Sequence, residues 1–209
     1  MKRRKHLILW VSALLLVFFG YLAAQAGPMV NKDSVEPGSK ITMKGTPLSL
    51  MGTPIIVGKP LPSSVLTEDA MQMKGVDLSM EKGSVLFLSI VPSLDTAVCE
   101  AQTHYLGEEG ARLPPSIRRI TISRDTPFAQ KRFAKEAKLE DIRYLSDYKE
   151  GEFGRSTGLL IDDLRLLART VILVDKQGTV RYIQVVPELT NLPDMDAAFE
   201  QAILLDREN

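Results

Sequence analysis

The chain has little of several residue types on which common protein chemistry depends. Its 209 residues contain one cysteine, Cys99, together with two histidines and one tryptophan. A single cysteine excludes a disulfide within the chain and any metal site built from several cysteines. No histidine is placed to activate Cys99 as the nucleophile of a hydrolase, and the sequence has no glycine-rich phosphate loop or metal-ligand spacing. We therefore expect neither a cofactor nor a metal.

The chain also lacks an excess of charge of either sign. Lys+Arg and Asp+Glu are equal at 26 each, so no overall field attracts the protein to nucleic acid, and we expect no nucleic-acid partner. Hydrophobic residues make up 44% and charged residues 25% of the chain, which is ordinary for a soluble globular protein. The length suits one domain with an appendage.

The first 26 residues have the pattern of an export signal. Basic residues 2–5 precede an uncharged apolar segment, residues 7–24, and residues 24–26 resemble a small-x-small cleavage site. The apolar segment is longer than the usual signal-peptide core of ~7–15 residues and close to the ~20 that span a bilayer. This favours a retained membrane anchor with its basic end in the cytoplasm, although a cleaved signal peptide that leaves the protein secreted or periplasmic also fits. In both cases we expect the domain to lie outside the cytoplasm.

The export signal is followed by a linker and one domain. Residues 27–40 are polar and include proline and glycine, so we expect an unpacked tether. Residues 41–209 are expected to form the domain. It opens with an N-terminal β-hairpin, in which residues 41–44 and 48–51 pair around a turn at Gly45-Thr46-Pro47.

Strand and helix patterns alternate through the rest of the domain. Apolar strand patterns occupy residues 65–67, 76–78, 84–90, 118–122, 144–145, 170–174 and 180–186. Helical patterns occupy residues 99–109, 127–138, 152–157 and 195–205. This alternation predicts an α/β fold, a central mixed β-sheet flanked by helices on both faces. The strand at residues 84–90 has a nearly continuous apolar character, so it should be central and covered on both sides.

Cys99 lies where this central strand turns into a helix. Free N–H groups and partial positive charge at a helix N-terminus favour a thiolate there. Pro92, Thr96 and Cys99 form a P-x-x-x-T-x-x-C pattern, and Thr96 shares a helix face with Cys99, so its hydroxyl can donate to the sulfur. Pro92 can wall the site without adding a competing N–H donor. The alternative is that Thr96 only caps the helix and that Cys99 is a small buried apolar residue.

The segment around Cys99 resembles the peroxidatic motif of the peroxiredoxins, and more narrowly that of their bacterial thiol peroxidase subfamily. Further segments in the same order are similar to that subfamily, and they are residues 43–47, 92–96, 121–133, 145–147, 167–175 and 186–190. The resemblance extends over residues 41–205. It implies a thioredoxin-like fold, a homodimer and an enzyme that reduces hydrogen peroxide or organic hydroperoxides.

The resemblance also implies roles for individual residues. Cys99 would attack the peroxide and become a sulfenic acid, Thr96 would hydrogen-bond the peroxide and hold the sulfur, and Pro92 would shield the site. Arg169 matches the family arginine that lies against the thiolate. Lowering a cysteine pKa from ~8.5 to ~6 takes about 3.4 kcal/mol, of which a helix N-terminus supplies ~0.3–1 kcal/mol, so a fixed cation is needed. Without the family match, a solvated charge at the end of a strand would be the preferred interpretation of Arg169.

One departure from the subfamily changes the expected cycle. Many members have a resolving cysteine at the position that is Ala134 in this chain. We therefore expect a one-cysteine cycle, in which a thioredoxin-like protein or a low-molecular-weight thiol reduces the sulfenic acid. A disulfide between the Cys99 residues of two chains is the second possibility. A different class of function also stays open, a tethered binding, scaffold or oxidant-sensing domain that has lost turnover.

Overall fold

The computed structural model describes residues 29–208. The strands are β1 (Met29–Val30), β2 (Lys40–Met43), β3 (Thr46–Met51), β4 (Leu66–Glu68), β5 (Lys74–Val76), β6 (Leu86–Ile90), β7 (Arg118–Ser123), β8 (Arg143–Ser146), β9 (Leu160–Ile161), β10 (Thr170–Val174) and β11 (Val180–Val185). The α-helices are α1 (Ala97–Glu108), α2 (Pro127–Ala137), α3 (Glu152–Thr157) and α4 (Met195–Arg207), and the 3-10 helices are η1 (Leu78–Met80) and η2 (Glu109–Arg112).

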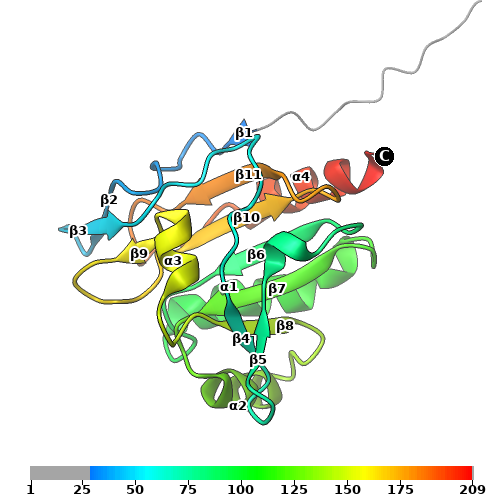
Figure 1. Cartoon of the computed structure of the whole chain (residues 1–209), viewed down its shortest axis with the longest axis horizontal. Coiled ribbons are helices and arrows are strands. Elements are labelled where there is room, and N and C mark those ends of the chain that lie inside the picture. Colours follow the sequence, from blue (N-terminus) through cyan, green and yellow to red (C-terminus); the bar gives the residue numbers. More distant parts are fainter. Residues whose placement is uncertain (1–28, 209) are drawn as a thin grey trace, which may run out of the picture.

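The main sheet has eight strands in the order β1-β11-β10-β6-β7-β8-β4-β5 (Figure 1). Strand β6 pairs with β10 in the antiparallel and with β7 in the parallel direction, so the sheet is mixed. All five residues of β6 are buried, which confirms the expected central strand. Because Ile90 is paired with Ile122, the carboxyl ends of β6 and β7 lie side by side at the same end of the strands. The segment with Cys99 follows β6 at that end.

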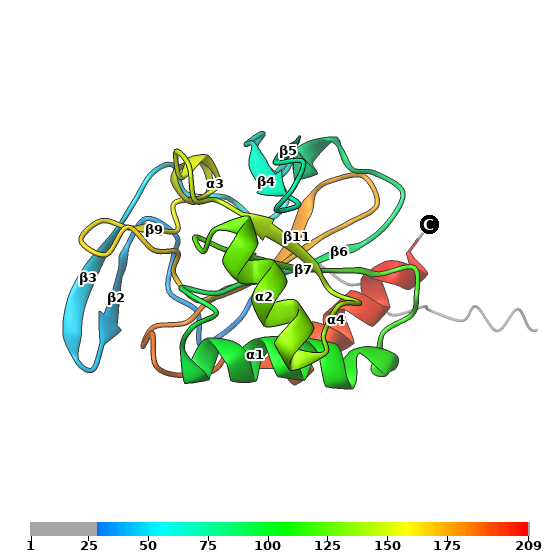
Figure 2. The same ribbon diagram turned by 90° about the horizontal axis from the view of Figure 1, so that it is seen from below.

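Helices cover both faces of the sheet, as the sequence pattern predicts. Successive residues of β6 point to opposite faces, where they join two separate apolar clusters. Leu88 packs in the cluster that includes Phe153 of α3, and Phe87 packs in the cluster that includes Leu106 of α1 and Phe199 of α4. Figure 2 shows α1 and α4 on one side of the sheet and α3 on the other. The rings of Phe87 and Phe199 pack edge to face with their centroids 5.4 Å apart, and this contact holds α4 against the sheet.

The predicted N-terminal hairpin is formed by β2 and β3, and β9 extends it to a three-stranded sheet. Its turn is Lys44-Gly45 rather than the predicted Gly45-Thr46-Pro47. Lys44 and Gly45 have φ angles of 50° and 80°, and a two-residue loop with positive φ at both positions matches the twist of paired strands. Thr46 and Pro47 therefore begin β3. The sequence pattern did not predict the short strand β9.

The expectation of an unpacked linker at residues 27–40 is wrong for the part that the structure describes. Met29 and Val30 form β1, which pairs with β11 in the parallel direction. The Asn31 amide donates to the hydroxyl of the buried Tyr182 at 3.0 Å, and Val35 N donates to the Val185 carbonyl. Backbone pairing and one buried amide hold this polar segment, and neither shows in an apolar pattern.

Within residues 29–208, no helix is both long and apolar enough to cross a membrane. The predicted apolar segment at residues 7–24 lies outside the described residues.

Candidate active site

Cys99 lies in the first turn of α1, at the carboxyl edge of the central strand β6. The N-cap of the helix is Thr96, whose backbone is extended, with φ −132° and ψ 139°. The Cys99 side chain is completely buried and forms part of an apolar cluster with Val91 and Leu94. The sulfur is thus shielded from bulk water, which strengthens its electrostatic interactions with the groups around it.

The hydroxyl of Thr96 serves the sulfur and not the helix end. Its Oγ1 lies 2.9 Å from Cys99 Sγ and 3.0 Å from the Ser93 carbonyl oxygen, and it makes no capping hydrogen bond to a backbone N–H. A hydroxyl has one proton, so it can donate either to Ser93 or to the sulfur. A thiolate accepts that proton more strongly than a carbonyl does. The arrangement therefore contradicts the alternative in which Thr96 only caps the helix.

Arg169, directly before β10, brings a guanidinium to the same sulfur. Its Nη2 lies 3.4 Å from Cys99 Sγ, and the residue is only 2% exposed. Nη1 donates to Gln102 Oε1 at 2.9 Å and to the Val98 carbonyl at 3.4 Å, and Nε donates to the Leu189 carbonyl at 3.0 Å. Arg169 is therefore not the solvated charge that its position at a strand end also allowed.

Among residues 29–208, the partners of the Arg169 guanidinium are uncharged oxygens and the sulfur. Within residues 29–208, no carboxylate forms an ion pair with it. A buried charge is costly unless an opposite charge compensates it, and the arginine side chain does not deprotonate in proteins. Ionised Cys99 would supply that compensating charge. The structure thus joins a group that needs an anion to a group that can become one.

Gln102 is a site residue that the sequence reasoning did not identify. It is completely buried one turn after Cys99, and its Nε2 donates to Ser89 Oγ of β6 at 2.8 Å while its Oε1 accepts from Arg169. The amide thereby fixes the guanidinium without neutralising it. A three-residue spacing from Cys99 was the available signal, but a glutamine within a helix gives no other indication of such a role.

Asp125 is a second residue that the sequence reasoning did not assign to the site. Its carboxylate accepts from Ser93 Oγ and from Leu94 N, both at 2.7 Å, and so ties the loop before α1 to the start of α2. The N-cap of α2 is Thr126, whose hydroxyl accepts from Ala129 N. Asp125 is thus available for the loop that carries Pro92.

Pro92 is buried in this loop next to the end of β6. No hydrogen bond links it to the sulfur, and its predicted shielding role stays a prediction. A depression of about 620 Å³ lies beside the first turn of α1, between that turn and the loop after β11, and it is lined by Ala97, Val98, Ala101, Thr190, Asn191 and Leu192.

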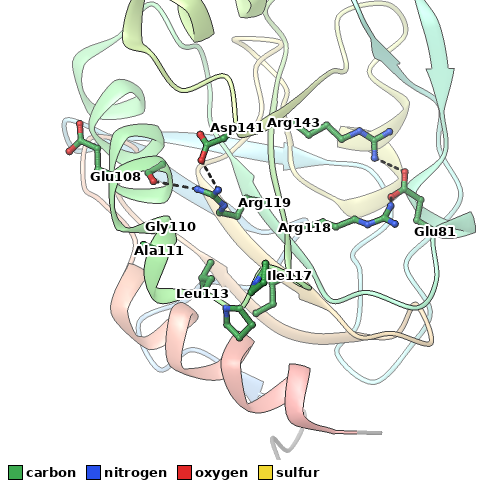
Figure 3. Close-up of a pocket in the computed structure, with 13 residues that line it drawn as sticks. Glu81, Glu108, Gly110, Ala111, Leu113, Ile117, Arg118, Arg119, Asp141 and Arg143 are labelled. Carbon is green, nitrogen blue, oxygen red and sulfur yellow. Dashed lines mark hydrogen bonds and ion pairs between the residues drawn. The ribbon is translucent and has the colours of Figure 1, made fainter.

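A larger cavity of about 1000 Å³ lies at the opposite end of the strands, where β7 and β8 begin (Figure 3). Its three arginines are each paired with carboxylates in the described residues. Arg118 and Arg143 bind Glu81 at 2.9 and 2.6 Å, and Arg119 binds Asp141 at 2.6 Å. These charges are already compensated, which distinguishes the cavity from the site at Arg169.

Comparison with known proteins gives consistent matches over most of the chain. The profile of the family described as Redoxin matches residues 56–199. A thiol peroxidase of Halalkalibacterium halodurans is 42% identical over 165 residues, which cover 78% of this chain and 97% of that protein. A thiol peroxidase of Bacillus subtilis is 38% identical over 164 residues, which cover 78% of this chain and 96% of that protein.

Solved structures match the fold as well. A peroxiredoxin-like protein from Aquifex aeolicus has a TM-score of 0.69 and 34% identity, and the match covers 78% of this chain and 95% of that one. A thiol peroxidase from Chromobacterium violaceum has a TM-score of 0.66, covering 78% of this chain and 94% of that one; at 22% identity this likeness concerns the fold alone.

The contact between Arg169 and Cys99 predicts how the reactivity of the sulfur depends on the guanidinium. Replacing Arg169→Met removes the cation that favours the thiolate. Alkylation of Cys99 by iodoacetamide at neutral pH should then slow by about tenfold or more, because one pH unit in thiol ionisation corresponds to a factor of ten. The measurement is the alkylation rate between pH 5 and 10. A rate profile identical to that of the wild type would show that Arg169 does not stabilise the Cys99 thiolate.

The neutral amide of Gln102 gives a second prediction. Gln102→Glu would place a carboxylate at the position 2.9 Å from Arg169 Nη1, where it would compete with Cys99 as the counterion of the guanidinium. Gln102→Met is the matched control, because it removes the same hydrogen bond without adding charge. We expect the glutamate variant to be alkylated about tenfold more slowly than the methionine variant at neutral pH. Equal rates for the two variants would contradict the need for an uncharged partner.

Proposed function

The chain belongs to the Redoxin family and, within it, to the thiol peroxidases, and from that premise we propose that Cys99 is the peroxidatic residue of a one-cysteine cycle. The protein is an oxidoreductase that reduces peroxides at the expense of thiols. The observation that carries the assignment to Cys99 is the contact of its sulfur with Arg169, a buried cation without a carboxylate partner in residues 29–208.

The reaction at the sulfur requires charge to move onto an oxygen. The Cys99 thiolate attacks one peroxide oxygen, a sulfur–oxygen bond forms, and the oxygen–oxygen bond breaks. The sulfur is oxidised to a sulfenic acid, and the leaving oxygen takes a proton and departs as water or an alcohol. Arg169 and the Thr96 hydroxyl lie where they can stabilise the negative charge that passes from sulfur to oxygen.

Reduction must come from outside the chain, since Cys99 is its only cysteine. A first external thiol attacks the sulfenic sulfur and releases water, which leaves a mixed disulfide. A second thiol then regenerates Cys99 and leaves with the first as a disulfide. The position of the expected resolving cysteine, Ala134, is buried in α2. A thioredoxin-like protein or a small thiol are both compatible with this cycle.

A disulfide between the Cys99 residues of two chains is the less favoured route. A sulfur–sulfur bond is about 2.05 Å long, so both sulfurs would have to reach a common surface. Cys99 is completely buried, and the first turn of α1 would have to open in both copies. The alternative of a binding or oxidant-sensing domain without turnover is not favoured either, because relatives that match over almost their whole length are named as thiol peroxidases.

The proposal extends to a homodimer. Phe128 in the first turn of α2 and Leu192 before α4 are large apolar side chains with exposed fractions of 57% and 51%, and we assign both to the interface of that dimer. Leu192 also lines the depression beside α1. A second copy that covers these side chains would remove apolar surface from water.

The one-cysteine cycle predicts both a rate and a product. Stopped-flow oxidation of the wild type by hydrogen peroxide should be orders of magnitude faster than that of free cysteine and should be absent in Cys99→Ser. Mass spectrometry after one equivalent of peroxide should show a subunit that has gained one oxygen atom. A rate no higher than that of free cysteine would refute the enzyme assignment, and a product at twice the subunit mass would refute the one-cysteine cycle.

We also propose that the domain is exported, and that residues 7–24 retain it at the membrane. Support comes from the sequence alone, in which a basic start precedes an uncharged apolar segment. Expression of the full chain with a C-terminal tag should give a membrane-bound protein with its original N-terminus. Release into the soluble exported fraction with a new N-terminus near residue 27 would contradict the anchor and support cleavage, and a tagged domain protected in the cytoplasm would contradict export.

A further inference from the structure

Glu188, in the loop after β11, binds the tip of the N-terminal hairpin. Its carboxylate accepts from Lys44 N at 2.9 Å, from Gly45 N at 3.3 Å and from the Thr42 hydroxyl at 2.8 Å. It also accepts from the hydroxyl of Thr190 at 2.8 Å. One side chain therefore joins segments that are more than 140 residues apart in the sequence.

The shape of the hairpin turn makes this contact possible. Lys44 and Gly45 both have positive φ, and in this two-residue turn their consecutive N–H groups reach a single carboxylate. These hydrogen bonds, with that from Lys44 N the strongest, lower the pKa of Glu188 to about 2. The carboxylate is therefore ionised at every pH at which the protein would be assayed.

The same loop is bonded to the hairpin through its backbone. Thr42 N donates to the Pro187 carbonyl at 2.7 Å, and Leu189 N donates to the Thr42 carbonyl at 2.8 Å. The residue next to Glu188 is thus fixed in position by β2. The carbonyl oxygen of Leu189 in turn accepts from Arg169 Nε at 3.0 Å.

A continuous set of contacts leads from the hairpin to the sulfur. Glu188 and Thr42 hold Leu189, Leu189 holds the Nε side of the guanidinium, and the Nη2 side of the same planar group faces Cys99 at 3.4 Å. A guanidinium is rigid and flat, so a change at Nε turns Nη2 as well. Gln102 holds only the Nη1 corner and cannot fix that rotation by itself.

We propose that Glu188 is a positioning residue, which uses the N-terminal hairpin to hold the Leu189 carbonyl and thereby orients the Arg169 guanidinium toward Cys99. This rests on the proposed function in one respect, that the sulfur reacts as a thiolate stabilised by Arg169. The hairpin is then a structural support of the active site, although none of its residues touches the sulfur in the described contacts.

The test compares variants at both ends of the contact. Glu188→Ala removes the acceptor, and Thr42→Val removes one donor on the hairpin while keeping the size of the side chain. Asp69→Ala is the matched control: Asp69 also accepts backbone N–H groups of a turn, those of Met71 and Gln72, but its turn joins β4 to β5 and does not contact Arg169. Iodoacetamide alkylation of Cys99 between pH 5 and 9 is the measurement.

We expect Glu188→Ala to lower the alkylation rate at neutral pH by about fivefold, since a guanidinium displaced by roughly 1 Å loses part of its attraction for the sulfur. Thr42→Val should show a smaller change in the same direction, and Asp69→Ala none. In an Arg169→Met background, Glu188→Ala should have no further effect, which a general loss of structure would not reproduce.

Folded Glu188→Ala protein with the wild-type rate profile would overturn the proposal. If that variant does not fold, Thr42→Val decides, and an unchanged profile there also overturns it. A further slowing by Glu188→Ala in the Arg169→Met background would equally count against it. Alkylation does not require peroxide, so this test is independent of the peroxidase assay. A wild type that reacts slowly with peroxide would refute the proposed function, and the alkylation rates would still test the role of Glu188.

Discussion

The site depends on one electrostatic contact, that between a buried guanidinium and a buried sulfur. At the observed 3.4 Å, a full charge on each group would give an attraction of about 5 kcal/mol at an effective dielectric constant of ~20. The helix N-terminus near Cys99 contributes ~0.3–1 kcal/mol under ordinary conditions. Arg169 is therefore the larger influence on the charge of the sulfur, and the helix start serves mainly to place Cys99.

The chemistry of the other Arg169 partners follows from that contact. Gln102 and the carbonyls of Val98 and Leu189 use up donors of the guanidinium but carry no net charge. A carboxylate in any of these places would satisfy the cation and remove its need for a thiolate. The arginines of the cavity in Figure 3 show the opposite arrangement, because Glu81 and Asp141 compensate them. Of these two arginine sites, only the one beside Cys99 therefore holds a guanidinium without a carboxylate partner.

The sequence allowed the prediction of the elements and residues that have local signals. Cys99, Thr96 and Arg169 lie in segments with a family resemblance, the apolar strand patterns located β6 and β10 closely, and a helical pattern located α3. The residues that were not predicted act over long distances.

Gln102 acquires its role only when β10 packs beside α1, and the partner of Glu188 is a hairpin turn more than 140 residues away. Strand β1 was missed for the same reason, since its stability comes from pairing with β11.

The position of Thr96 connects reactivity with the stability of α1. A threonine at an N-cap that bonds a backbone N–H contributes about 1 kcal/mol to a helix, but the Thr96 hydroxyl faces the sulfur and makes no such bond. The first turn keeps the backbone bond from Glu100 N to the Thr96 carbonyl, and Arg169 Nη1 donates to the Val98 carbonyl in the same turn. A thiol that reduces the oxidised Cys99 must reach a completely buried sulfur. Opening the first turn would break the contacts of Thr96 and Arg169 with the sulfur, so the groups that favour the thiolate during oxidation also oppose exposure of the sulfur for reduction.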